Sequence, residues 1–333
     1  MALVAVLDIV AGPGVGFLPL VSLGPAFAGL VGGWRRTALI GGLALALCAL
    51  LGFYNGLLDG RRGFTAMASV AGVTGAGLAA AAMRQRREAE LADVRAIAEV
   101  AQRVVLRPVP RTARHLSIAV SYTSAVSAAR IGGDLYEVVV FRGGVRVIVG
   151  DVQGKGLEAV ETAATVLGAF REAAHEEGGL TAVSDRLERA LGREPEDEKF
   201  VTAVLAEFRD DGGVSLLNHG HPAPMLISSS GAVTFADPIC YAPPLGLDWP
   251  GTAAPEPLEM HLAREDQLLF FTDGVTETRD QKGVFYPLAD KAELLRAAEP
   301  HAALAALRSD LVAYAGQPLR DDAAMLLIRY RCP

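Results

Sequence analysis

The sequence predicts an α+β domain that follows an apolar, helical N-terminal region. Residues 1–82 hold six charged side chains, whereas the rest of the 333-residue chain holds 63, as in ordinary soluble domains. After residue 113, short runs rich in β-branched residues occur in groups, and longer helical patterns separate these groups. Single strands and single helices do not alternate. This grouping favours an α+β fold over a doubly wound parallel sheet.

Three uncharged stretches, at residues 15–33, 37–58 and 64–83, each have roughly the ~20 residues that a helix needs to cross a membrane. We therefore expect a transmembrane helical region over residues 1–83, with about three spans. Residues 1–12 are apolar but short and carry Asp8, which suits a partial or re-entrant span or part of a fourth helix. The alternative is a buried helical hairpin of a soluble protein.

Basic residues set the orientation expected for these spans. Arg84, Arg86 and Arg87 directly follow the last stretch, so the positive-inside rule predicts a multi-pass protein of the cell membrane with a cytoplasmic C-terminal domain. Within the last stretch, small residues recur every four positions. They favour close helix packing, either between two copies or within one bundle, and are Ala68, Gly72, Ala76 and Ala80.

Residues 84–110 are expected to form a linker helix, which Pro108 and Pro110 end. Its apolar residues recur at alternating steps of three and four. This pattern favours either a short parallel coiled coil, and so a homodimer through the linker, or an amphipathic helix packed on its own domain. The repeating positions, here called the seam, are Leu91, Val94, Ala98, Ala101 and Val105.

The domain predicted over residues 111–333 consists of strand-like runs and helical patterns. Glycine pairs at 143–144 and 212–213 predict hairpin turns. The strand-like runs cover residues 116–122, 136–141, 145–152, 200–208, 214–217, 267–272 and 324–330, and the helical patterns cover 157–176, 181–191, 290–298 and 302–314.

Aspartates stand at the ends of several of these strands. Asp134 precedes a strand, Asp151 and Asp273 end apolar strands, and Asp321 and Asp322 open the last one. Carboxylates gathered in one site raise each other's pKa, and hard ions such as Mg²⁺ or Mn²⁺ remove that cost. Two such ions about 3.5–4 Å apart can clamp a phosphoryl group for attack by water. The pattern therefore indicates a carboxylate metal site.

Several other functions are excluded or disfavoured. A net charge of −7 argues against a nucleic-acid partner. Lys155 follows Gly-x3-Gly spacing rather than that of a phosphate-binding P-loop. Cys240 lacks an arginine six residues on, which excludes a cysteine phosphatase. His219 and His221 either bind metal or form a structural turn, and the turn is the favoured interpretation.

The motifs ARIGGDLYEVV, VIVGDVQGKGLEA, FVTAVLAEF, LLNHGHPAPML, DQLLFFTDGVTETRD and DDAAMLLIRY resemble, in order, those of SpoIIE-type (RsbU-like) protein serine/threonine phosphatases. These belong to the metal-dependent, type 2C (PPM) superfamily. The resemblance covers about residues 113–330. Departures from the usual motif stand at Glu137, at Glu158 and at His219, and none removes an expected ligand.

The resemblance implies an αββα sandwich with two divalent metal ions, Mn²⁺ or Mg²⁺, between the sheets. Asp134 and Asp151 would be metal ligands, with Asp151 bridging both ions and the backbone carbonyl of Val152 adding a further oxygen. Asp273 and Asp321 would complete the site, with Asp321 preferred over Asp322 by alignment alone.

Arg130 is a candidate to bind the substrate phosphate, because an arginine can donate two parallel hydrogen bonds to it. The resemblance further implies hydrolysis of phosphoserine or phosphothreonine in a regulatory protein, for which an anti-sigma-factor antagonist is a candidate. The alternatives are a catalytically weak sensor or scaffold that keeps the phosphatase fold and binds a regulatory partner, and, less favoured, a membrane transporter with a regulatory domain.

Overall fold

The computed structural model describes residues 6, 18–54, 56, 60–123, 133–192, 199–240, 242–247, 255–297, 299–319 and 321–331, without the side chains of 18, 62, 94–99 and 101–103. The chain divides into two compact units, residues 1–94 and 95–333. Most of residues 1–12, and the predictions made for them, lie outside the described residues.

The first unit is entirely helical in its described part. It contains η1 (Leu18–Ser22), α2 (Leu23–Val31), α3 (Trp34–Tyr54) and the beginning of α4 (Arg61–Val105). Two helical segments, Trp34–Tyr54 and Gly63–Asp93, are long and apolar enough to cross a membrane. By length and composition alone they are weak evidence for a membrane protein, since core helices of soluble proteins share these properties.

The first of the three predicted spans does not form one long helix in the described residues. Its apolar helical part covers Pro19–Val31, which is shorter than the ~20 residues of a span. A 3₁₀ turn precedes α2, and Gly32 ends that helix in an extended conformation. The described residues provide two helices of sufficient length, and because residues 15–17 lie outside the described part, the expectation of about three spans stays a prediction.

Small residues bring the helices of the first unit close together. Gly41 lies so near Thr74 that a Cβ on the glycine would stand 2.2 Å from the threonine methyl carbon, and a Cβ on Gly29 would stand 2.8 Å from the Cα of Gly77. The small-residue stripe predicted from Ala68 to Ala80 is exposed, and a neighbouring face of α4 makes the contacts within the unit instead. Among the described residues of the first unit, this stripe therefore takes no part in packing within the bundle.

Two antiparallel sheets form the centre of the second unit. The order of the first is β1-β2-β11-β10-β7-β8 and that of the second β3-β4-β5-β6-β9. The strands of the first sheet are β1 (Thr112–Ala113), β2 (Leu116–Thr123), β7 (Met225–Ile227), β8 (Val233–Phe235), β10 (Gln267–Phe271) and β11 (Ala323–Tyr330). Those of the second are β3 (Asp134–Phe141), β4 (Gly144–Val152), β5 (Val201–Phe208), β6 (Gly213–His219) and β9 (Leu258–His261).

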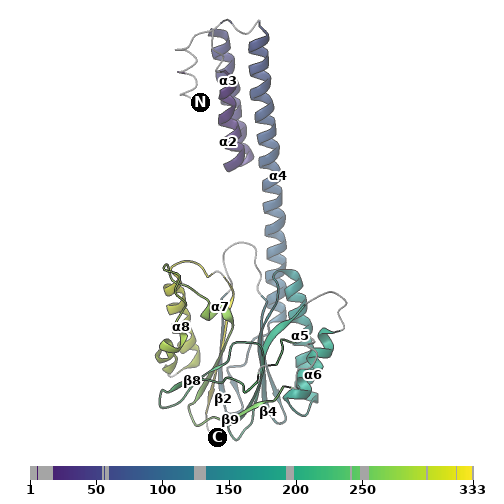
Figure 1. Ribbon diagram of the computed structural model, residues 1–333, viewed down its shortest axis with the longest axis vertical. Coiled ribbons are helices and arrows are strands. Elements are labelled where there is room, and N and C mark those ends of the chain that lie inside the picture. The colour runs from purple at the N-terminus through teal and green to yellow at the C-terminus, as the bar shows by residue number, and fades with distance from the viewer. Residues whose placement is uncertain are drawn as a thin grey trace. The chain divides into compact units, whose positions relative to one another are not determined.

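Helices cover the outer face of each sheet, as Figure 1 shows. α5 (Leu157–Glu176) and α6 (Leu180–Leu191) pack on the second sheet. The first sheet is covered by η2 (Leu288–Arg296) and α8 (Pro300–Ala315), next to the short α7 (Asp273–Thr276). These layers make the α+β, αββα architecture, which confirms the predicted fold class.

Strand β4 shows why the strand runs are almost continuously apolar. Val147 and Val149 face the core between the two sheets, whereas Ile148 faces the core under α5 and α6. Successive side chains of a strand point to opposite faces, so a strand buried on both faces needs apolar residues at nearly every position. This burial on both faces explains why the apolar runs in the sequence predicted the strands. The predicted hairpin turn at Gly143–Gly144 joins β3 to β4.

Candidate metal centre

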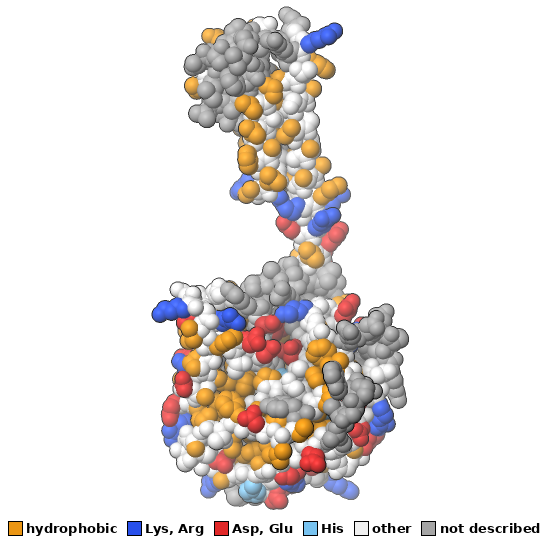
Figure 2. All heavy atoms as spheres, in the orientation of Figure 1, with side chains coloured by type: hydrophobic (Ala, Val, Ile, Leu, Met, Phe, Trp, Pro, Cys, Tyr) orange, Lys and Arg blue, Asp and Glu red, His pale blue; other side chains and the backbone are white. Residues whose placement is uncertain are grey.

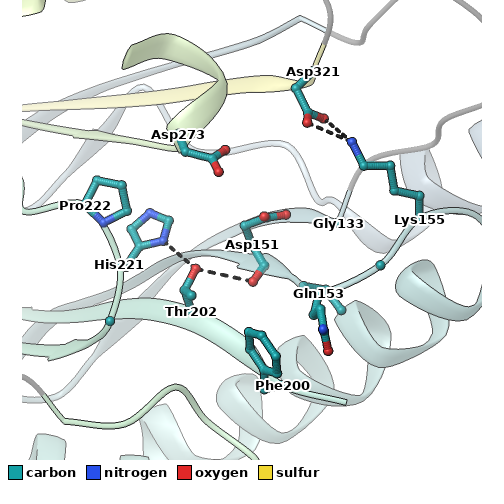
Figure 3. Close-up of a pocket in the computed structure, with 13 residues that line it drawn as sticks. Gly133, Asp151, Gln153, Lys155, Phe200, Thr202, His221, Pro222, Asp273 and Asp321 are labelled. Carbon is teal, nitrogen blue, oxygen red and sulfur yellow. Dashed lines mark hydrogen bonds and ion pairs between the residues drawn. The ribbon is translucent and has the colours of Figure 1, made fainter. Parts of the chain in front are cut away.

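A pocket of about 650 Å³ lies where ends of both sheets meet. Its walls come from the end of β4, the start of β5, the turn after β6, and the residues next to β10 and β11. Asp151, Asp273 and Asp321 project into this space from segments far apart in the sequence (Figure 3). In the view of Figure 2, acidic side chains, drawn in red, gather on the visible face of this unit.

Strand pairing brings the first two aspartates together. Asp134 begins β3 and lies opposite Asp151 of β4 in the antiparallel register. Gly133 permits this approach, because a Cβ there would stand 2.4 Å from the carbonyl oxygen of Val152 and 2.9 Å from the Asp151 carboxylate. The backbone N–H of Val152 donates to the Gly133 carbonyl at 3.2 Å. The sequence Gly133-Asp134 is thus required by the packing of β3 against β4.

Thr272 holds the Asp134 side chain. Its hydroxyl donates to Oδ2 of Asp134 at 2.8 Å and accepts a hydrogen bond from the backbone N–H of Ala324 at 3.0 Å. Thr272 is fully buried and Asp134 is nearly so. Since Thr272 follows β10 and Asp134 starts β3, this contact joins the two sheets at the site.

Asp273 follows Thr272 and opens α7. The next residue, Gly274, lies against the start of β11, where a Cβ would stand 1.8 Å from the carbonyl oxygen of Asp322. No other residue fits without moving one of these two backbones. This glycine fixes the position of Asp273 relative to the pair Asp321–Asp322.

The two adjacent aspartates have different surroundings. Asp321 lines the pocket, and both of its oxygens contact the Lys155 ammonium, at 3.0 and 2.7 Å. Asp322 is buried, and its carboxylate accepts a hydrogen bond from the Tyr122 hydroxyl. Of the two, Asp321 is the one that lines the pocket, and its preference over Asp322 as a metal ligand stays a prediction.

Burial and mutual repulsion raise the pKa of three of these carboxyl groups. The pKa of Asp134 lies well above its ordinary value because of burial and then because of the Asp151 charge. Burial, followed by Asp273 and Asp321, raises the pKa of Asp151 to about 7. The pKa of Asp273 is also raised, by burial first and then by Glu277 and Asp321. A bound cation would remove this repulsion.

The donor set suits hard divalent ions. Asp134, Asp151, Asp273 and Asp321 offer carboxylate oxygens, and Val152 offers a backbone carbonyl, which are the ligands that Mg²⁺ and Mn²⁺ prefer. Within the described part of the chain, no three acidic, histidine or cysteine side chains converge closely enough to hold one ion as they lie. Asp134 is turned to Thr272 and Asp321 to Lys155. The chemistry fits the ions, but the side chains must reorient to bind them.

His219, the last residue of β6, and His221, in the turn after it, use both ring nitrogens for protein contacts. His219 contacts the Ser184 hydroxyl and the Pro243 carbonyl, each at 2.9 Å. His221 contacts the Thr202 hydroxyl and the Phe271 carbonyl, each at 3.1 Å. Burial lowers the pKa of His221 to about 4, so its ring is neutral at neutral pH. These contacts favour the structural interpretation over metal binding.

Glu137, one of the departures from the usual motifs, binds an arginine and does not line the pocket. Glu137 is buried and accepts a hydrogen bond from Arg171 at 2.6 Å, and Arg171 also donates to the Val105 carbonyl at 2.8 Å. Arg130 lies outside the described residues, so its suggested contact with phosphate stays a prediction.

Sequence reasoning missed several residues around the site. Thr202 and Thr272 support the strand ends that carry Asp151 and Asp273, and Tyr122 binds Asp322 from β2. Thr272 stands directly before Asp273 in the sequence, which is the one available signal for its role. Thr202 and Tyr122 reach the site only through strand pairing, so no local pattern identifies them.

Two antiparallel sheets between helical layers, with aspartates at adjoining strand ends, define a PP2C-type fold. The chain belongs to the SpoIIE family of PPM (PP2C-type) phosphatases, since the family profile described as "Stage II sporulation protein E (SpoIIE)" matches residues 142–331. The match covers more than half of the chain and includes Asp151, Asp273 and Asp321.

Solved structures share the fold at low sequence identity. The RsbU and RsbW domains of Rv1364c from Mycobacterium tuberculosis match with 23% identity and a TM-score of 0.57, over 66% of this chain and 61% of that one. The SiaA-PP2C domain of Pseudomonas aeruginosa matches with 21% identity and a TM-score of 0.58, over 75% and 99%. RsbX in complex with magnesium matches with 16% identity and a TM-score of 0.50, over 65% and 96%. The chain thus spans less than two thirds of the first of these proteins.

Proposed function

We propose that this chain is a membrane-anchored, metal-dependent phosphatase that hydrolyses phosphoserine or phosphothreonine in a cytoplasmic regulatory protein. The observation that carries the proposal is the convergence of Asp151, Asp273 and Asp321 on one pocket, with Asp134 behind them. Raised pKa values of Asp134, Asp151 and Asp273 support it, because these carboxylates repel each other until a cation joins them.

Two divalent ions, Mn²⁺ or Mg²⁺, would supply the activation of water and the neutralisation of phosphoryl charge. Asp134, Asp151, Asp273, Asp321 and the carbonyl of Val152 are the proposed ligands, with Asp151 between the two ions. The related structure that contains magnesium supports this choice of ion. Thr272 keeps Asp134 oriented, and Gly133 and Gly274 keep the backbones close enough for the ligands to meet.

The substrate and the location are part of the proposal. A relative that contains RsbU and RsbW domains supports a role in partner-switching regulation, with an anti-sigma-factor antagonist as the substrate class. The segments Trp34–Tyr54 and Gly63–Asp93 would anchor residues 1–83 in the membrane, and residues 84–110 would link them to the phosphatase domain at 111–333. Arg84, Arg86 and Arg87 support a cytoplasmic position for that domain.

The test is hydrolysis of a phosphoserine protein by residues 84–333, with Mn²⁺ or Mg²⁺ and with EDTA. We expect turnover with metal, none with EDTA, and nearly none for Asp151→Asn, which removes the bridging charge. Asp185→Asn, an exposed change on α6, is the matched control and should keep full turnover. Metal-independent turnover, or near-normal turnover by Asp151→Asn with saturating metal, would refute the proposal. Absence of any turnover would favour the alternative of a phosphatase-fold scaffold.

A further inference from the structure

Lys155 stands apart among the residues of the pocket. Of the described residues that line it, Lys155 alone carries a positive charge. Its ammonium lies 2.7 Å from one oxygen of Asp321 and 3.0 Å from the other. The lysine sits in a turn between Gly154 and Gly156, both in the left-handed region with φ of 103° and 91°. This turn follows the end of β4, and the ammonium lies beside the Asp321 carboxylate (Figure 3).

The charge of Lys155 reaches the other carboxylates as well. It lowers the pKa of Asp151 and of Asp273, opposing the effects of burial and of like charges. Lys155 therefore offsets part of the repulsion that a divalent ion would otherwise remove.

We propose that Lys155 and a divalent metal ion exchange at Asp321: the ammonium holds this carboxylate in the metal-free protein, and an entering ion displaces it. This inference rests on the metal site of the proposed function and adds to it a residue that sets metal affinity. No covalent bond changes in the exchange.

The contacts of Asp321 show why both cations cannot use it in the same way. Oδ2 contacts the ammonium, and Oδ1 accepts from both the ammonium and the backbone N–H of Asp322, the latter at 3.0 Å. An ion that takes a carboxylate oxygen would stand within a few ångströms of the ammonium, and the two positive charges would repel each other. The lysine must therefore leave before Asp321 can act as a ligand.

The exposure of the pair makes this displacement feasible. The side chains of Lys155 and Asp321 are 34% and 48% exposed, so water screens their attraction and can solvate the released ammonium. Lys155 thus acts as a weak, replaceable counterion. The consequence is a metal-free site that remains partly neutralised, and a metal affinity lower than the carboxylates alone would give.

The experiment measures Mn²⁺ binding by calorimetry to the full chain in detergent, at one pH, without substrate. Lys155→Met, and Lys155→Gln as a second variant, should lower the Kd for Mn²⁺ about fivefold, the size of one exposed ion pair. In an Asp321→Asn background, the same lysine changes should tighten Mn²⁺ binding clearly less, because only the effect of the lysine charge on Asp151 and Asp273 remains. The control is Lys291→Met, which removes an ion pair of similar exposure to Asp310, at 3.0 Å, away from the pocket. It should leave the Kd at the wild-type value.

Each outcome decides the matter. An unchanged Kd in both Lys155 variants would overturn the exchange while leaving the metal site intact. Equal tightening with and without the Asp321 carboxylate would also overturn it, since the lysine would then act only through its general charge. If the wild-type protein bound no Mn²⁺, the proposed metal site would fail, and the exchange with it.

Discussion

Replacing Asp151 with asparagine should stabilise the metal-free phosphatase domain, although the same change should abolish turnover. Folding raises the pKa of this carboxyl group from 3.8 to about 7, so the ionised group is less favourable in the folded state than in the unfolded one. One pH unit corresponds to about 1.36 kcal/mol, and the difference is therefore worth about 4 kcal/mol above pH 7. Asparagine has nearly the same size and removes this cost.

The sign of the pH dependence follows from the same values. Below the unfolded pKa of 3.8, the group is protonated in both states and costs nothing. As the pH rises from about 4 through about 7, the unfolded state loses its proton first, and the metal-free wild type loses stability relative to the variant. At pH 8 the variant should have the higher free energy of unfolding by about 4 kcal/mol, and at pH 4 the two should be nearly equal.

The assay is urea unfolding of residues 84–333 in metal-free buffer at pH 4, 6 and 8, followed by circular dichroism. With saturating Mn²⁺ the order should reverse at pH 8, because the ion stabilises the wild type through Asp151 and the variant lacks that ligand. Asp185→Asn, on the exposed side of α6, should follow the wild type throughout. A lower stability of Asp151→Asn at pH 8 without metal, or a difference independent of pH, would refute the electrostatic argument.

Three further predictions concern the site, the membrane and the linker. Thr272→Val removes the hydroxyl that binds Asp134 and should cost about 2 kcal/mol in urea unfolding. Because the lost hydrogen bond raises the pKa of Asp134 further, the variant should also bind Mn²⁺ more weakly than the wild type, measured by calorimetry, and unchanged binding would contradict this. Reporter fusions after residue 90 should be active only in the cytoplasm, and an exported reporter would reverse the topology. Ala98→Leu combined with Ala101→Leu should increase both the dimer fraction and the phosphatase rate of residues 84–333, measured by analytical ultracentrifugation and turnover. If only the dimer fraction changes, the linker is a tether.

The strands of the phosphatase domain were predictable because both of their faces are buried. In the run Val145–Val152, for example, most residues are β-branched and apolar, and Gly150 and Asp151 stand near its end, so its approximate limits are visible in the sequence. The short strands β1, β7, β8 and β9 were not predicted, since two to four residues carry no clear periodicity. The pattern at 290–298 predicted an α-helix, and the chain forms the 3₁₀ segment Leu288–Arg296 there instead.

The candidate site was predictable as a set of aspartates but not as a geometry. The motifs identified Asp134, Asp151, Asp273 and Asp321, whose ligand roles stay a prediction. The contact of Lys155 with Asp321 joins residues 166 positions apart, and no local pattern reports it. Of the linker seam, Leu91 is exposed and Val105 packs partly against its own domain, while the side chains of the positions between them lie outside the described residues.

The position of β11 has a consequence for how this enzyme-like domain is made. β11 is the last strand of the domain in chain order, yet it lies in the middle of the first sheet, between β2 and β10. Asp321 and Asp322 immediately precede it. During synthesis, β2 and β10 therefore cannot be joined in one sheet until the residues up to Tyr330 have left the ribosome and β11 can pair with both. The pocket lined by Asp151, Asp273 and Asp321 forms in the same step, so a chain interrupted before residue 321 contains the helices of the first unit but not the complete set of pocket carboxylates.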